Sequence, residues 1–238
     1  MLFFYVRHGD PIYNPDSLTP LGEKQAEAVA KRLALYGVDK IFASTSNRAI
    51  QTAKPTCELT KKEPVLLDFA NEHHAWQNLT VHTATGARIW MFQHAKTVEL
   101  VNSKEMRALG DRWFDHPAFA EFAFEEEINR IYDAADAFLV ELGYEHDRYT
   151  GKYIAKSPTN ERVAMFAHQG FGLAFLSCVL DIPYPQFCTH FDTSHTGVTV
   201  IDFSEHNGIC VPKILTLSSD AHLYREGLPT KYNNSIYF

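Results

Sequence analysis

The sequence has no run of apolar residues long enough to cross a membrane, and no basic segment precedes its first apolar run at residues 1–6. A spanning helix needs roughly 20 predominantly apolar residues. A secretory signal needs a basic start and a longer apolar core than this one. We therefore expect no membrane partner and a cytoplasmic location.

Cysteine is scarce, with four residues in the chain. They form no CxxC pair and no zinc-binding spacing, which argues against a disulfide framework and against a structural zinc site. The expectation is a set of reduced thiols, mostly buried, at Cys57, Cys178, Cys188 and Cys210.

Positive charge is also in short supply, because 22 Lys and Arg residues face 29 Asp and Glu residues, for a net charge of −7. Proteins that bind polyanions are normally basic. Nucleic acid is therefore not an expected partner, although a local cationic pocket for a small anion is compatible with this balance.

The composition that remains is that of a folded globular protein: the 238 residues are 45% hydrophobic and 21% charged. A chain of this length makes one large domain or two small ones. Because the sequence has no linker of biased composition and no internal repeat, we expect a single domain over residues 1–238. The segment of about 76–130 is expected to form an inserted lid that determines specificity.

Short all-apolar runs alternate with helical patterns along the chain. The predicted strands are 2–6, 40–44, 65–67, 163–167, 198–203 and 214–217, the helices are 20–36, 47–59, 125–142 and 170–180, and a hairpin is predicted at 149–154. Such alternation is typical of an α/β fold, and all-apolar strands indicate a mostly parallel sheet buried on both faces. We expect a three-layer α/β/α architecture, with residues 73–124 forming helices over one edge of the core.

A histidine follows two of the predicted strands at the same position. His8 comes directly after the first strand and Arg7, and His168 directly follows the strand at 163–167. Ligands of open α/β sheets bind outside the carboxyl ends of the strands. Either histidine alone also fits a purely structural role. If the two strands are neighbours, however, both imidazoles meet in one crevice, and the pair favours function.

Two arginines are expected at the same edge of the sheet. Arg7 precedes His8, and Arg48 falls in the first turn of the helix that follows the strand at 40–44. A planar guanidinium matches the geometry of a phosphoryl group, and a helix N-terminus adds backbone donors. The alternative for Arg48 alone is a surface ion pair.

Three segments then resemble the histidine phosphatase superfamily, also called the phosphoglycerate mutase-like fold. Residues 7–14 read RHGDPIYN and resemble the family pattern R-H-G-x-x-x-x-N. Residues 18–26 read LTPLGEKQA and are similar to L-T-x-x-G-x-x-Q-A, and residues 44–53 read STSNRAIQTA and are similar to S-x-x-x-R-A-x-Q-T-A. His168 matches the second histidine of the family. A lone R-H-G is a weak signal, whereas this ordered set is specific.

The resemblance implies a phosphohistidine mechanism that needs no metal and no cofactor, on a small phosphorylated substrate. His8 would be the nucleophile. Arg7, Arg48 and His168 would hold the phosphoryl oxygens and stabilise charge in the transition state. Asn14 would add a neutral hydrogen bond to the phosphoryl group.

The leaving oxygen also needs a proton donor. Position 169 is Gln, which excludes an Asp directly after the second histidine and disfavours the phytase and acid phosphatase branch. Residues 71–74 read NEHH and resemble the N-E-R-H segment of the mutase branch, so Glu72 is the preferred donor and Asp68 the reserve. Gln169 stands where most members have Gly, and its side chain is expected near the pocket, either in contact with the substrate or held away from it.

A phosphatase is favoured over a mutase, because residues 75–76 read AW where the mutase resemblance would imply Tyr-Gly, and Arg107 and Arg112 stand apart without a proline run. A non-catalytic domain that binds phosphorylated ligands is the alternative from another class. A metallohydrolase built on His73, His74, His82 and His94 is a further one, although no HExxH spacing supports it. The apolar segment 232–238 is expected to pack internally or against a second copy, which keeps a homodimer open.

Overall fold

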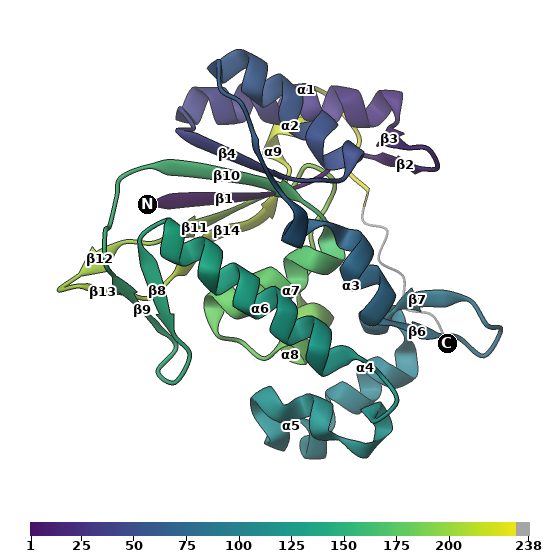
Figure 1. Cartoon of the computed structure of the whole chain (residues 1–238). Helices are drawn as coiled ribbons and strands as arrows, with labels where there is room; N and C mark the ends of the chain where they lie inside the picture. Colours follow the sequence, from purple (N-terminus) through teal and green to yellow (C-terminus); the bar gives the residue numbers. More distant parts are fainter. Residues whose placement is uncertain (232–238) are drawn as a thin grey trace.

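The computed structural model describes residues 1–231, and its centre is a six-stranded sheet (Figure 1). In spatial order the strands are β14 (Lys213–Ser219), β11 (Val198–Asp202), β1 (Leu2–Arg7), β10 (Arg162–Ala167), β4 (Lys40–Ser44) and β5 (Val65–Leu67). β1 pairs in parallel with β10, β10 with β4 and β4 with β5. β11 is antiparallel to both of its neighbours, so it alone runs against the others. The predicted mostly parallel sheet is confirmed.

The two faces of the sheet carry separate hydrophobic clusters, because alternate residues of β1 point to opposite sides. Phe4 and Val6 pack against α1 (Pro20–Tyr36) and α2 (Asn47–Thr60). Phe3 and Tyr5 belong to the larger cluster on the other face. That cluster includes residues of α3 (Glu72–Asn78), α6 (Phe124–Glu141), α7 (Gln169–Leu180) and α8 (Tyr184–His190). Figure 1 shows α1 and α2 on one side and α6 and α7 on the other, so the three-layer α/β/α fold is confirmed.

Local sequence signals explain where α1 begins and ends. The Thr19 side chain accepts a hydrogen bond from the backbone N–H of Gly22, and Pro20 occupies the first turn. Gly37 follows the last turn with φ of 76°, a left-handed conformation that glycine adopts without strain. α2 begins after Ser46, as expected, and continues through Pro55 to Thr60.

The expectation of an all-helical segment at 73–124 is wrong in one part, because a β-hairpin follows α3. Its strands are β6 (Thr80–His82) and β7 (Arg88–Trp90). The turn between them contains Gly86 at φ of 83° and the Thr83 hydroxyl, which accepts from the Ala87 N–H. Short helices follow: η2 (Met91–Gln93), α4 (Ala95–Val101), α5 (Lys104–Leu109), η3 (Gly110–Asp115) and η4 (Pro117–Phe119).

Smaller elements complete the described chain. They are the β2–β3 hairpin (Pro11–Tyr13, Asp16–Leu18), η1 (Asp68–Ala70), α9 (Ala221–Arg225), and a small sheet of β12 (Glu205–His206), β13 (Ile209–Cys210), β9 (Lys152–Ala155) and β8 (Tyr144–Asp147). The hairpin predicted at 149–154 is therefore real but begins earlier. The four cysteines are free and buried, as expected. No helix in residues 1–231 has the length and apolar character that a membrane crossing requires. The segment 232–238, on which the homodimer expectation rests, lies outside the described residues.

Candidate active site

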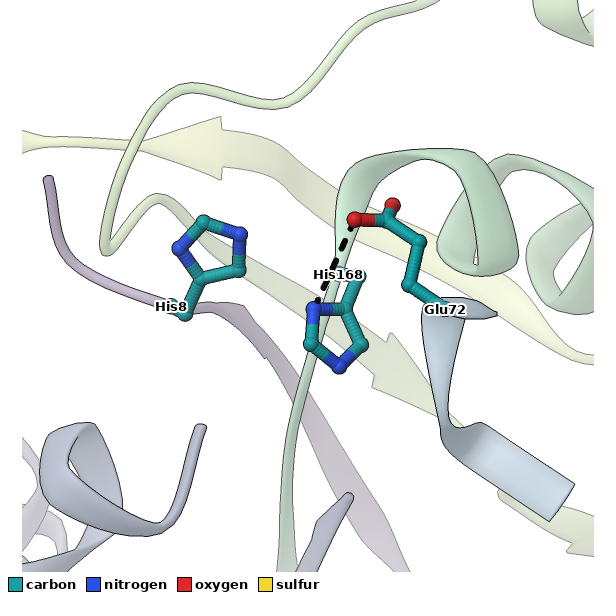
Figure 2. Close-up of side chains that lie close together, drawn as sticks. All are labelled: His8, Glu72 and His168. Carbon is teal, nitrogen blue, oxygen red and sulfur yellow. Dashed lines mark ion pairs between the residues drawn. The ribbon is translucent and has the colours of Figure 1, made fainter. Parts of the chain in front are cut away.

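His8 and His168 lie side by side because their strands are parallel neighbours in register. Arg7 pairs with Ala167 at the ends of β1 and β10, and the next residue of each strand is the histidine. The backbone N–H of His8 donates to the Ala167 carbonyl at 2.9 Å, and the two imidazole centroids are 5.2 Å apart. Both side chains are buried, at 1% and 0% exposed. Figure 2 shows the two rings facing the same space as Glu72.

The surroundings of His8 select one tautomer and one charge state. Its Nδ1 lies 2.7 Å from the Gly9 carbonyl oxygen. Because a carbonyl only accepts, Nδ1 carries the proton and Nε2 keeps its lone pair. Burial lowers the pKa of His8 well below its ordinary value, and the nearby His168, Arg7 and Arg48 lower it further. At neutral pH the ring is therefore uncharged, with Nε2 available as a nucleophile.

Hydrogen bonds to its backbone and to one of its ring nitrogens fix the position of His168. The Tyr5 hydroxyl donates to the His168 carbonyl at 2.6 Å, and the Ser44 hydroxyl lies 2.8 Å from Nε2. Nδ1 has no hydrogen-bond partner among residues 1–231 and lies 3.6 Å from the Glu72 carboxylate. Burial, followed by Arg48 and Arg7, holds the pKa of His168 well below its ordinary value. When the Ser44 hydroxyl donates to Nε2, the proton of the neutral ring is on Nδ1, which can then donate it to a phosphoryl oxygen.

The two arginines are placed at the same crevice. Arg48 in the first turn of α2 forms ion pairs with Asp16 at 2.8 Å and with Glu72 at 3.1 Å, and its side chain is 11% exposed. Arg7 donates from Nη1 to the Thr193 carbonyl. In the described part of the chain, the buried Nε of each arginine has no hydrogen-bond partner. Buried guanidinium donors without partners are costly, and an anion between them would satisfy both.

Glu72 rather than Asp68 reaches the histidines. One Glu72 oxygen accepts from the Gly170 N–H at 2.7 Å, and the other faces Arg48 and His168. The Asp68 side chain is 79% exposed and pairs with His74 instead. The structure thus places the preferred acid in the site and the reserve acid outside it.

A cavity of about 990 Å³ is lined by Arg7, Arg48 and Glu72, while His8 and His168 lie buried behind these residues and are not part of its lining. Its lining comes from the loop after β1, the β2–β3 hairpin, the start of α2, α3, β7, η2 and the start of α7. The lining residues are Arg7, Asp10, Pro11, Tyr13, Asp16, Thr45, Ser46, Asn47, Arg48, Asn71, Glu72, His73, Trp76, Trp90, Gln93, Gln169, His195 and Lys231.

The two residues expected to bind substrate have different positions. Gln169 lines the cavity, and its side-chain amide donates to the Asp192 carboxylate. Asn14 is exposed in the turn of the β2–β3 hairpin and does not line the cavity. Its neighbour Tyr13 does, with its ring centroid 5.5 Å from the Arg48 guanidinium.

His195 belongs to no motif in the sequence, yet its ring lies 5.6 Å from the ring of His8. Its Nδ1 is 3.5 Å from the Asp10 carboxylate, and it lines the cavity. Burial, followed by the charge of Arg7, lowers the pKa of His195 to about 3. The available signal was its place just before β11, a strand that pairs with β1.

Three side chains of this site are close enough together to ligate one metal ion. One ligand atom from each of His8, Glu72 and His168 lies within 4.8 Å of the others. However, both Glu72 oxygens already face protein donors, Arg48 and the Gly170 N–H. Within residues 1–231, the histidines of the metallohydrolase alternative form no such group.

Gly170, near the start of α7, packs directly against the ring of Trp90 in β7. A Cβ at this position would lie 2.3 Å from Cη2 of Trp90, whose ring is buried and stacked on Phe92. We expect Gly170→Ala to destabilise the protein by about 1–3 kcal/mol and to lower kcat, because the same residue's N–H holds Glu72. Urea denaturation and steady-state kinetics measure the two effects.

The control for that substitution is a double-mutant cycle with Trp90→Phe, whose smaller ring leaves room for the added methyl group. The cost of Gly170→Ala should be lower in that background. An alanine variant as stable and as active as the native chain would contradict the packing described for Gly170.

Comparisons with known proteins agree with this geometry. A family model described as the histidine phosphatase superfamily (branch 1) matches residues 3–212. The chain is 23% identical to phosphoserine phosphatase 1 of Hydrogenobacter thermophilus, over 92% of each protein. It superposes with a TM-score of 0.58 on Entamoeba histolytica phosphoserine phosphatase in complex with 3-phosphoglyceric acid, at 19% identity over 93% and 98% of the two chains. A mycobacterial glucosyl-3-phosphoglycerate phosphatase has the same TM-score, at 18% identity over 92% and 99%.

Proposed function

Because this chain belongs to the histidine phosphatase superfamily (branch 1), we propose that it hydrolyses monoesters of a small phosphorylated metabolite through a phosphohistidine on His8. The observation that carries the proposal is the state of His8: buried, neutral, with Nδ1–H on the Gly9 carbonyl and Nε2 free. Two guanidinium groups and His168 surround it. The phosphatase relatives support hydrolysis.

In the first step His8 Nε2 attacks phosphorus, and the bond from phosphorus to the ester oxygen breaks. Arg7, Arg48 and His168 bind the phosphoryl oxygens and offset the charge that develops on them. The departing oxygen takes a proton from Glu72, which receives that proton from the monoanionic phosphate ester as the ester binds. The products of this step are the free alcohol and phosphorylated His8.

In the second step a water molecule attacks the phosphohistidine. The Glu72 carboxylate takes the proton from the water, the phosphorus–nitrogen bond breaks, and its electron pair returns to His8 Nε2. Inorganic phosphate leaves with the proton that Glu72 took from the water, and the Glu72 carboxylate pairs again with Arg48. The chain's own residues supply every group that these two steps use.

Gln169 enters the proposal as a wall of the cavity that is tied to Asp192. Asn14 is left out of the proposed phosphoryl site because its side chain is exposed on the hairpin turn. A non-catalytic binding domain is disfavoured, since a nucleophile, an acid and two partly buried arginines lie close together. A mutase is disfavoured by the phosphatase relatives.

The test is to trap the covalent intermediate in the presence of EDTA. The protein is mixed with a ³²P-labelled alkyl phosphate and quenched in base within the first turnover. We expect protein-bound label that is stable in base and labile in acid, mapped to the peptide containing His8, and hydrolysis that persists in EDTA. Hydrolysis lost to EDTA without bound label would favour a metallohydrolase. Neither label nor hydrolysis across a substrate panel would favour a binding domain.

A further inference from the structure

The leaving group of the substrate must lie along one face of α3. Glu72 and Trp76 are four residues apart on this helix, which places their side chains on the same face about 6 Å apart along the axis. Glu72 is the proposed proton donor to the ester oxygen. The carbon chain attached to that oxygen therefore starts beside Glu72 and extends toward Trp76.

The wall of the cavity that this carbon chain meets is formed by two tryptophan rings, and neighbouring side chains hold these rings in place. The rings of Trp76 and Trp90 pack edge to face, with centroids 5.0 Å apart and an interplanar angle of 78°. The Arg88 guanidinium lies 5.8 Å from the Trp76 ring and donates from Nε to the Thr80 hydroxyl at 2.6 Å. Arg88 covers one face of the Trp76 indole, and Trp76 is 36% exposed and lines the cavity.

No lysine or arginine from this wall is among the residues that line the described cavity. The cavity residues supplied by α3 with its cap Asn71, by β7 and by η2 are Asn71, His73, Trp76, Trp90 and Gln93, besides Glu72. Arg7 and Arg48 lie at the phosphoryl end. Lys231 is the remaining lysine or arginine that lines the described cavity, and residues 232–238 contain none. The Arg88 guanidinium beside Trp76 does not line the described cavity and already donates to the Thr80 hydroxyl and the Gln77 carbonyl. A carboxylate on the leaving group would therefore have to draw Arg88 away from these acceptors, and a desolvated carboxylate without a partner is costly.

We propose that Trp76 and Trp90 form a subsite for a planar, uncharged ring on the alcohol part of the substrate. The preferred substrates are then aryl- or heteroaryl-bearing phosphate monoesters, rather than phosphorylated amino acids or phosphoglycerates. The cavity supports this assignment, since about 990 Å³ lies at the upper end of the roughly 300–1,000 Å³ of pockets for drug-sized ligands. This inference rests on the proposed function, because it takes the position of the leaving oxygen from Glu72.

The test compares two unactivated alkyl esters that differ only in the ring, 3-phenylpropyl phosphate and n-propyl phosphate. We expect kcat/KM of the native chain to be at least tenfold higher for the first. Trp76→Ala should lower kcat/KM for 3-phenylpropyl phosphate by about 5- to 100-fold, the usual effect of losing one stacking partner. It should leave the value for n-propyl phosphate within threefold. Trp76→Phe, which keeps a ring, should restore most of the preference.

Two controls separate this subsite from the phosphoryl site and from general damage. Inhibition by inorganic phosphate reports on the phosphoryl end alone, so its inhibition constant should be unchanged in Trp76→Ala. Tyr149→Ala removes an aromatic ring that is 97% exposed on a distant turn, and it should change neither ester. Equal kcat/KM for the two esters, or a higher value for O-phosphoserine than for 3-phenylpropyl phosphate, would overturn the subsite while leaving the phosphatase activity established. If the native chain shows neither hydrolysis of any ester nor phosphohistidine, the proposed function itself is overturned.

Discussion

Replacing His8 with alanine is expected to lower kcat for phosphate monoesters by about ten-thousand-fold or more, the scale of loss when a covalent nucleophile is removed. We expect neither of the two histidines nearest to it in the described chain to replace it as the nucleophile. The free nitrogen of His168 is set to bind a phosphoryl oxygen, and His195, with a pKa of about 3, is a weak base. Steady-state kinetics with a ring-bearing alkyl phosphate measure the loss.

The His8→Ala variant should keep its phosphoryl site, because Arg7, Arg48 and His168 are held by other groups. Isothermal titration with inorganic phosphate should therefore still detect binding. His206→Ala, at an exposed histidine of the small sheet, is the matched control and should keep native turnover. A His8→Ala variant with activity within tenfold of the native chain would rule out phosphohistidine catalysis.

Replacing Glu72 with glutamine should lower kcat for alkyl phosphates by about 10²- to 10⁴-fold, the usual contribution of a general acid. The amide oxygen can still accept from the Gly170 N–H, but the side chain can no longer supply a proton. A 4-nitrophenolate leaving group needs little protonation, so 4-nitrophenyl phosphate should lose much less. This dependence on the leaving group separates proton donation from the structural role of the Glu72–Arg48 ion pair.

Asp68→Asn is the matched control for Glu72, since it removes the other carboxylate that the sequence offered as donor. It should behave as the native chain with both substrates, because its side chain is exposed and outside the cavity. If Asp68→Asn shows the loss that depends on the leaving group and Glu72→Gln does not, the assignment of the acid is wrong.

The sheet and the two histidines could be predicted because the controlling signals are local. A strand buried in a parallel sheet is recognised from its run of apolar residues alone, whatever its neighbours are. The polar residue that follows it lies at the carboxyl end of the sheet, where ligands bind. The prediction that His8 and His168 meet needed only that β1 and β10 be neighbours, which the structure confirms. The cap residues Thr19 and Gly37 are also local signals, and they mark the residues where α1 begins and ends.

The parts that could not be predicted depend on contacts between distant segments. β7 was interpreted as part of a helix because its apolar residues do not alternate with polar ones, and the β6 strand that pairs with it is only three residues long. His195 reaches His8 because β11 pairs with β1, although nearly 190 residues separate the two side chains in sequence. Asn14 lies four residues after Asp10, yet the hairpin between them carries it away from the cavity.

The contact between Gly170 and Trp90 has a consequence for how this enzyme would discriminate among substrates. One side of Gly170 touches the wall of the proposed ring subsite, and its N–H holds the proposed acid. A ring that seats well against the indoles therefore steadies the carboxyl group that must protonate its own departing oxygen. A poor fit loosens the same carboxyl group. Selectivity would then appear in the rate of bond cleavage more than in the strength of binding, since a contact felt mainly in the transition state raises kcat.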